Sequence, residues 1–195
     1  MEPLDSIKKD FDGSIPSAVD LDKYIKSHKG DYLSKDLANL ALGIAKVSER
    51  GRFIFRIHDS LKAEQHLMIN AISTENYVRP HKHNELEKTE SFRLLKGKAS
   101  VVMFDDDGKV NKVVKLSEVG KNIVTIRPNI WHTIISDEPF VILESKRQAK
   151  GGYIAETDKE FASWAPEENT DDGKEYFQNL LEKTNNLVEI NTNLN

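Results

Sequence analysis

The sequence has 195 residues, enough for one domain with terminal extensions, and 38% of them are hydrophobic, enough for one core. Lysine and arginine number 28 against 32 acidic residues, a formal net charge of −4. This balance argues against a nucleic-acid partner, because phosphate neutralisation requires a basic face. The absence of cysteine excludes disulfides, thiol nucleophiles, iron–sulfur clusters and cysteine-bound zinc. With no secretory signal pattern and no apolar run of roughly 20 residues, we expect a cytoplasmic protein with no membrane partner.

Helical periodicity is found towards the two ends of the chain. A short helix is expected around Val19–His28, before Gly30. Apolar residues at three- and four-residue spacing predict a second helix between an N-cap at Ser34 and a stop at Gly51, namely Leu37, Leu40, Ala41, Ile44 and Val47. An apolar stripe predicts a third helix, formed by Tyr176, Phe177, Leu180 and Leu181. We therefore expect a helical extension over 1–50, a central domain over 51–168, and a C-terminal helix and tail over 169–195.

Between these helices the sequence predicts short strands separated by turns. The Asp107-Gly108 pair in the segment Phe104–Val110 is typical of a tight hairpin, because glycine readily adopts positive φ. Many short strands at even spacing favour a mainly β fold, a closed barrel or jelly roll. The expected strands are Arg52–Ile57, His66–Ile72, Tyr77–His83, Ser91–Leu95, Ala99–Phe104, Val110–Leu116, Asn122–Ile126, His132–Ser136 and Phe140–Ser145.

The segment with most chemical information contains His81 and His83. Residues two apart in a strand project from the same face, so both imidazoles can point into a barrel. Glu90 on the next strand and His132 on a later one would complete a set of three nitrogens and one oxygen, which leaves positions open on a divalent metal. Taken alone, the His-x-His pair is equally well explained as incidental. Gly97, seven residues after Glu90, and a proline-containing turn before His132 favour the metal hypothesis.

This pattern of His-x-His, Glu, Gly and a later His resembles the cupin superfamily, and it is most similar to the cupin-fold metalloproteins of the WbuC type. The similarity spans about Arg50 to Glu168. It is carried by Tyr77-Val78-Arg79-Pro80-His81-Lys82-His83, Lys88-Thr89-Glu90, Phe104–Val110, Trp131-His132-Thr133, Glu144-Ser145-Lys146 and the closing segment Asp158–Pro166. The resemblance implies a double-stranded β-helix, that is, a jelly-roll barrel, with a metal held by His81, His83, Glu90 and His132. Genes of this family are associated with polysaccharide O-antigen clusters, which implies a sugar-derived ligand.

The sequence departs from the cupin pattern at two positions. The spacer from His83 to Glu90 is longer than the usual three or four residues, so Glu85 and Glu87 are alternative carboxylate ligands. Glu90 is preferred because its distance to Gly97 fits the motif. Before His132 the turn reads Arg127-Pro128-Asn129, where Pro-x-Gly is commoner.

Four further residues are candidates for substrate binding. Tyr77 and Arg79 share strand parity with the two histidines, and an inward guanidinium would bind a carboxylate or phosphate. Arg79 could equally pair with an internal acid such as Glu144, which is itself a candidate on the last strand. His58 is either a pocket residue or a surface histidine at a strand end. The basic run Lys146–Lys150 is expected to be a solvated loop.

The sequence is compatible with three functions. The first is a metal-dependent enzyme, acting on an anionic sugar or nucleotide-sugar intermediate of polysaccharide biosynthesis by polarising a carbonyl or hydroxyl. The second is an Fe(II)-dependent dioxygenase acting on a small organic acid, and the third is a non-catalytic module that binds or senses a small ligand. All three need a small anionic partner and one divalent transition metal, which is Fe for the second function and Fe, Zn, Mn or Ni for the others. A homodimer is also compatible, because cupins often form dimers.

Overall fold

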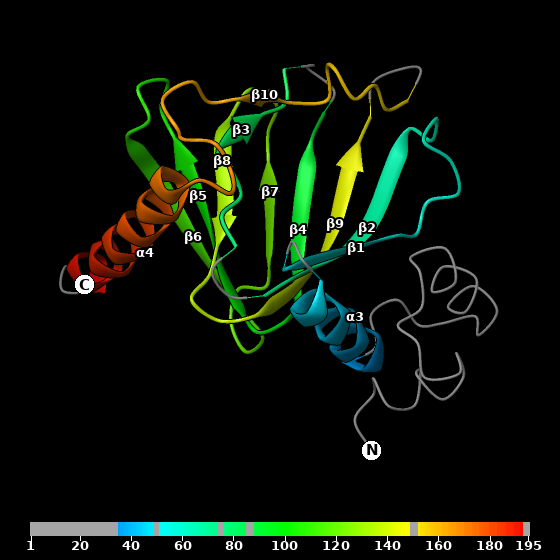
Figure 1. Ribbon diagram of the computed structural model, residues 1–195, viewed down its shortest axis with the longest axis horizontal. Coiled ribbons are helices and arrows are strands. Elements are labelled where there is room, and N and C mark those ends of the chain that lie inside the picture. The colour runs from blue at the N-terminus through cyan, green and yellow to red at the C-terminus, as the bar shows by residue number, and fades with distance from the viewer. Residues whose placement is uncertain (1–34, 49–50, 74–75, 85–87, 149–151, 193–195) are drawn as a thin grey trace.

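The computed structural model describes residues 35–48, 51–73, 76–84, 88–148 and 152–192. Two antiparallel five-stranded sheets face each other, with a helix near each end of the chain (Figure 1). The helices are α3 (Lys35–Val47) and α4 (Asp171–Thr192). Among the described residues, none of the helices is both long and apolar enough to cross a membrane. The helix predicted around Val19–His28 lies outside the described residues.

The first sheet has the strand order β1-β2-β9-β4-β7, and the second has the order β10-β3-β8-β5-β6. Apart from the β5–β6 hairpin and the β1–β2 pair, consecutive strands alternate between the two sheets. The strands are β1 (Arg52–Arg56), β2 (Gln65–Ile72), β3 (His81–Lys82), β4 (Glu90–Lys96), β5 (Lys98–Phe104), β6 (Val110–Ser117), β7 (Ile123–Ile126), β8 (Trp131–Ile135), β9 (Phe140–Arg147) and β10 (Glu160–Phe161).

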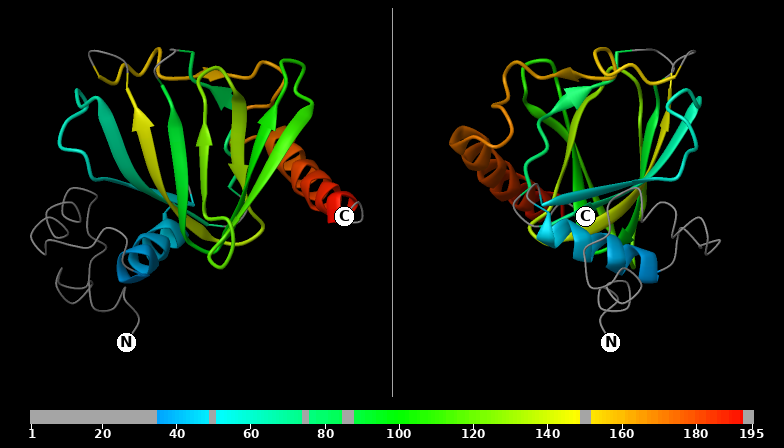
Figure 2. Two further views of the ribbon diagram at one scale, coloured as in Figure 1. Left: turned by 180° about the vertical axis from the view of Figure 1, so that it is seen from behind. Right: turned by 45° about the vertical axis from the view of Figure 1, so that its right-hand side comes forward.

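The pairing of these strands defines the topology. Strand β5 pairs with β6, β4 with β7, β3 with β8, and β2 with β9, all antiparallel. The chain from β2 to β9 is therefore one long hairpin whose two arms are wound together into a barrel (Figure 2). This is the double-stranded β-helix of cupins, and the fold class predicted from the sequence is confirmed.

Side-chain alternation along the strands divides the core into three layers. On β9, Ile142 lies in the cluster between the sheets, whereas its neighbour Val141 faces outward and packs under α3. On β5, Val101 likewise faces inward and Val102 faces outward to the cluster that α4 completes. The two helices therefore cover the outer faces of opposite sheets with their apolar stripes, and the barrel interior is left for the site.

Two turns meet their backbone requirements with different residues. Gly108 has φ of 79° in the β5–β6 hairpin, as the Asp-Gly pair predicts. Asn129 has φ of 61° in the turn before β8, where asparagine is one of the few residues besides glycine that adopt this conformation readily. The amide of Asn129 donates to the carbonyl of His83 at 2.8 Å, so this turn is tied to the segment that carries the histidines.

One predicted strand is much shorter in the structure. The expected strand Tyr77–His83 reduces to β3, His81–Lys82, and residues 76–80 approach it without regular pairing. In its place β3 gains β10, which sequence analysis missed, on its other side. The strand alternation that was extended back to Tyr77 therefore has no structural basis before His81.

Candidate metal centre

Three strands bring the predicted ligand residues to one place in the barrel interior. His81 on β3 pairs directly with His132 on β8 across the second sheet. Glu90 begins β4 in the opposite sheet, and His83 follows β3 directly. One ligand atom from each of the four residues lies within 4.8 Å of the others, and all four side chains are buried. The structure thus brings together the complete set that the sequence predicted.

The Glu90 carboxylate lies close to two of the imidazoles. Its Oε2 is 2.9 Å from Nε2 of His132 and 3.6 Å from Nε2 of His83. Two donors bound to one ion through bonds of about 2.1 Å stand about 3.0–3.4 Å apart. The spacing of these ligand atoms is therefore compatible with one ion shared among them.

Each histidine is oriented by a backbone carbonyl on its other ring nitrogen. Nδ1 of His81 lies 3.0 Å from the carbonyl of Arg79, Nδ1 of His132 lies 2.8 Å from that of Ile130, and Nδ1 of His83 lies 2.6 Å from that of Asp158. Carbonyl oxygens only accept hydrogen bonds, so every Nδ1 carries a proton, and Nε2 is the nitrogen of each ring that a metal would bind. Ligating histidines typically show this arrangement.

The donor chemistry also fits a metal ion. Nε2 of His83 is buried and has no hydrogen-bond partner among the described residues, although buried polar atoms normally have one. Burial, reinforced by the neighbouring His132, holds the pKa of His81 well below its usual value, which keeps this imidazole neutral. Three imidazoles and a carboxylate suit Fe, Zn, Mn or Ni.

Two neighbouring carboxyl groups have opposite protonation preferences. Burial alone would raise the pKa of Glu90, but the hydrogen bond to His132 and the nearby His83 imidazole hold it well below its usual value. Burial, followed by the charge and hydrogen bond of Glu90, raises the pKa of Glu144 well above its usual value. Glu144 therefore retains a proton beside an ionised Glu90.

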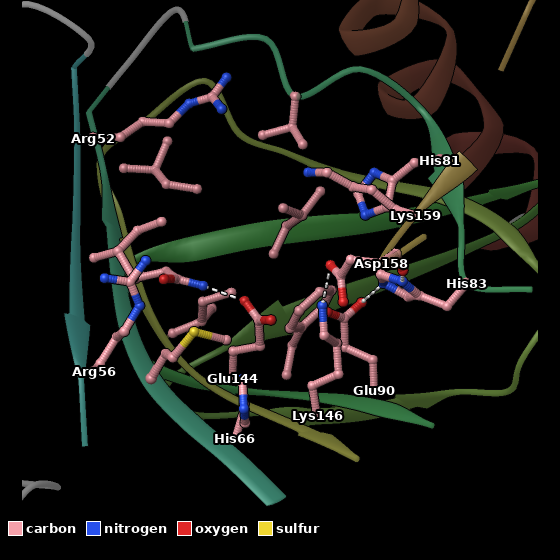
Figure 3. A pocket seen from close by; sticks show the side chains of 18 of the residues that line it. Arg52, Arg56, His66, His81, His83, Glu90, Glu144, Lys146, Asp158 and Lys159 are labelled. Carbon is pink, nitrogen blue, oxygen red and sulfur yellow. Dashed lines mark hydrogen bonds and ion pairs between the residues drawn. The ribbon is translucent and has the colours of Figure 1, made fainter. Parts of the chain in front are cut away.

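A cavity of about 240 Å³ lies between the sheets and includes this cluster. Figure 3 shows the predicted ligands His81, His83 and Glu90 on one side and Arg56 on the other. The lining comes mainly from β1, β2, β3, β4, β8 and β9, and from the loop that contains Asp158 and Lys159. The metal cluster therefore forms part of the wall of a pocket.

A buried charge network, which sequence analysis missed, also reaches this pocket. Nζ of Lys146 lies 2.7 Å from one carboxylate oxygen of Asp158, and Nζ of Lys88 lies 3.6 Å from the other. The expected solvated loop at Lys146–Lys150 is wrong at its three described residues, because β9 continues to Arg147 and both Lys146 and Gln148 are buried. Lys146 shares strand parity with Ile142 and Glu144, and this parity was the available signal.

The four predicted substrate-binding residues lie in different places. Glu144 lines the pocket and accepts a hydrogen bond from the Asn70 amide. Tyr77 packs in the cluster under α4, with its hydroxyl donating to the carbonyl of Pro166 at 3.1 Å. His58 stacks on His66, with ring centroids 3.9 Å apart, and it is His66 that reaches the pocket lining.

Arg79 lies outside the pocket lining, and its expected partnership with Glu144 is not formed. Its guanidinium donates to the carbonyl of Ala162 at 2.9 Å and lies over the ring of Phe161, 5.5 Å from the centroid. The strand parity that predicted an inward Arg79 fails because β3 begins only at His81. Glu85 and Glu87, the alternative ligands, lie outside the described residues.

A family model described as a domain of unknown function (DUF6016) matches residues 33–116, which include three of the four clustered residues but not His132. No curated protein matches the sequence significantly.

Solved structures with a similar fold include three bacterial proteins. One is an uncharacterized conserved protein with a double-stranded β-helix domain from Klebsiella pneumoniae, with 13% identity, 60% of this chain and 88% of that chain covered, and a TM-score of 0.43. A cupin superfamily protein from Desulfitobacterium hafniense has 14% identity, coverage of 53% and 83%, and a TM-score of 0.41. The capsular polysaccharide assembling protein CapF from Staphylococcus aureus has 16% identity, coverage of 59% and 32%, and a TM-score of 0.46. The strand order and register define the fold of this chain.

Proposed function

We propose that this protein binds one divalent transition metal in its barrel and uses the adjoining pocket to bind a small anionic molecule. The observation that carries this proposal is the buried group of three imidazoles and one carboxylate, with ligand atoms within 4.8 Å of one another. His81, His83, Glu90 and His132 would hold the ion. When bound, it would supply a Lewis acid that polarises a carbonyl or hydroxyl of the ligand.

The other pocket residues support binding of a polar ligand. Glu144 lines the pocket, and its carboxyl oxygens can accept a hydrogen bond from a ligand hydroxyl. Acidic neighbours raise the pKa of Lys146 despite its burial, so its ammonium group stays charged in the pocket wall, where Asp158 balances it. Lys159, which also lines the pocket, adds a positive charge that favours an anionic ligand.

The size of the pocket narrows the class of ligand. Its volume of about 240 Å³ is below the roughly 300 Å³ at the lower end of pockets that enclose drug-sized molecules. A single sugar or small organic acid fits this volume better than a nucleotide sugar does. The sequence resemblance to WbuC-type cupins supports a sugar-derived ligand, and we propose that class over the organic acids.

Metal titration of the stripped protein tests this proposal. Mn²⁺, Ni²⁺, Zn²⁺ and, without dioxygen, Fe²⁺ are added to protein dialysed against chelator, and binding is followed by calorimetry. We expect saturation at one ion per chain for at least one of these metals. Absence of binding by all four would contradict the proposal, as would binding that a His81→Ala variant retains unchanged.

A further inference from the structure

We propose that Arg56 is the residue that selects an anionic ligand, and that the ligand is a small hydroxylated anion such as a sugar acid or a sugar phosphate. This inference rests on the proposed function, because it places the ligand in the pocket beside the candidate metal centre. It replaces the clamp role that the sequence assigned to Arg79.

Arg56 is the last residue of β1 and belongs to the pocket lining. In Figure 3 its guanidinium points towards the pocket from the side opposite His81. Within the described residues, the exposed side chain of Arg56 has no hydrogen bond, ion pair or ring contact. The other lining arginine, Arg52, differs in this respect, because its guanidinium is bound to Asn76, to Glu168 and to the carbonyl of Tyr77. Arg56 thus offers a complete set of donors to a ligand.

The strand register places Arg56 at a useful distance from the cluster. Arg56 pairs with Met68 on β2, and Met68 pairs with Glu144 on β9, so the three residues form one row across the sheet. Adjacent strands are about 4.8 Å apart, so the Cα atoms of Arg56 and Glu144 are roughly 10 Å apart. At this separation of the two backbones, a molecule the size of a single sugar can contact both the guanidinium of Arg56 and the groups beside the metal cluster.

Asn70 adds a requirement for hydrogen-bond donors on the ligand. Its side chain is 9% exposed and lines the pocket, and its amide nitrogen donates to Glu144. Its Oδ1 is buried and has no hydrogen-bond partner among the described residues. A buried amide oxygen without a partner is unfavourable, and a hydroxyl of the ligand would satisfy it. Asn70 and Arg56 together therefore select a molecule that has both hydroxyl and anionic groups.

The test is a binding titration of four probes against the metal-loaded protein. Gluconate and glucose 6-phosphate carry both features, sorbitol lacks the anionic group, and hexanoate lacks the hydroxyls. We expect at least one of the first two to bind more tightly than sorbitol by about tenfold or more, since a charge-assisted bidentate contact is lost. The same anion should also bind several-fold more tightly than hexanoate, because loss of a neutral hydrogen bond usually has an effect of this size. The preference between carboxylate and phosphate shows which anionic group the pocket takes.

Variants then assign the effect to Arg56. Arg56→Gln should weaken binding of the preferred anion about tenfold or more, and Arg56→Lys should restore part of it. Arg93→Gln is the matched control, because Arg93 is an exposed arginine on β4 outside the pocket lining. This variant should bind the preferred anion as tightly as the unaltered protein does.

Three results would overturn the inference. They are equal binding of charged and neutral probes, absence of binding by both hydroxylated anions, and an Arg56→Gln variant with unchanged affinity. The last result, together with new self-association, would show that Arg56 instead protects the edge of the sheet. Metal content is measured on every sample. An Arg56→Gln variant that keeps its anion affinity at full metal content refutes only this inference, whereas failure of the unaltered protein to load metal refutes the proposed function, and the titration of metal-free protein still tests Arg56.

Discussion

Asp158 accepts a 2.6 Å hydrogen bond from Nδ1 of His83 through its backbone carbonyl. The carboxylate of the same residue lies 2.7 Å from Nζ of Lys146 in the barrel wall. One residue of the loop after β9 thus orients a candidate metal ligand and is itself held by a buried ion pair. The loop is part of the site, although no residue in it belongs to the predicted ligand set.

This ion pair should be important for stability. Replacing Lys146 with methionine deprives the buried Asp158 of its closest partner, and we expect the free energy of unfolding to fall by about 3–5 kcal/mol. Adding Asp158→Asn should destabilise by less than the sum of the two single changes. Urea denaturation of metal-free protein measures each value. Additive effects would mean that the two side chains do not interact.

Lys98→Met provides the matched control for that experiment. The pair between Lys98 and Glu138 has a separation of 3.7 Å, but both side chains are well exposed. Exposed pairs contribute little, so this variant should change stability by no more than about 1 kcal/mol.

Arg79 is expected to be structural. Arg79→Ala removes a charged donor from the carbonyl of Ala162, and we expect a loss of about 1.5–3 kcal/mol in the free energy of unfolding. Affinity for small anions should stay unchanged, because Arg79 is not in the pocket lining. Thermal melts and anion titrations on the same preparation check both expectations. Weakened anion binding at unchanged stability would return Arg79 to the role that sequence parity predicted.

The raised pKa of Glu144 predicts a pH dependence. Above about pH 4.3 the carboxyl ionises in the unfolded chain but stays protonated in the folded one. The unfolded state then binds fewer protons, so the free energy of unfolding falls as pH rises, by up to about 1.4 kcal/mol per pH unit until the folded pKa is reached. Glu144→Gln removes this dependence.

Urea denaturation of metal-free protein from pH 5 to pH 8 measures the effect. The stability of Glu144→Gln relative to the unaltered protein should rise with pH across this window. Glu175→Gln, at an exposed position on α4, should run parallel to the unaltered protein. If the stability of Glu144→Gln also changed with pH in parallel with that of the unaltered protein, Glu144 would have an ordinary pKa in the folded state.

The choice among the three candidate carboxylates is also testable. Glu90→Gln should weaken metal binding far more than Glu85→Gln or Glu87→Gln, because Glu90 Oε2 lies next to His132 Nε2 in the cluster. Calorimetric titration with the preferred metal compares the three variants. If Glu87→Gln abolished binding and Glu90→Gln had no effect, the ligand assignment would be wrong at this residue.

The strands could be predicted where their pattern is local. Alternation and the Asp107-Gly108 turn locate β5 and β6 within about one residue of their observed bounds, because these signals depend only on neighbours in the chain. The short strands β3 and β10 could not be delimited, since each has two residues and depends on pairing with distant partners.

In the candidate site too, the residues in a local motif could be predicted and those placed by distant contacts could not. His81 and His83 are two residues apart and form a recognisable motif, and Glu90 and His132 follow from its extension. Lys146, Asp158 and Arg56 are ordinary surface residue types. Lys146 and Asp158 lie in segments that carry the family resemblance, but neither segment predicts a buried position, and Arg56 has no motif around it. Their positions in the pocket depend on the winding of the barrel, which places β1 and the loop after β9 along one cavity.

The most direct test of this account is the metal content of the purified protein. Elemental analysis of the unaltered chain, His132→Ala and His58→Ala compares a clustered histidine with one outside the cluster. The account predicts about one first-row transition metal per chain in the unaltered protein and in His58→Ala, and most of it lost from His132→Ala. No metal in the unaltered protein even after loading, or equal metal in all three, would contradict it.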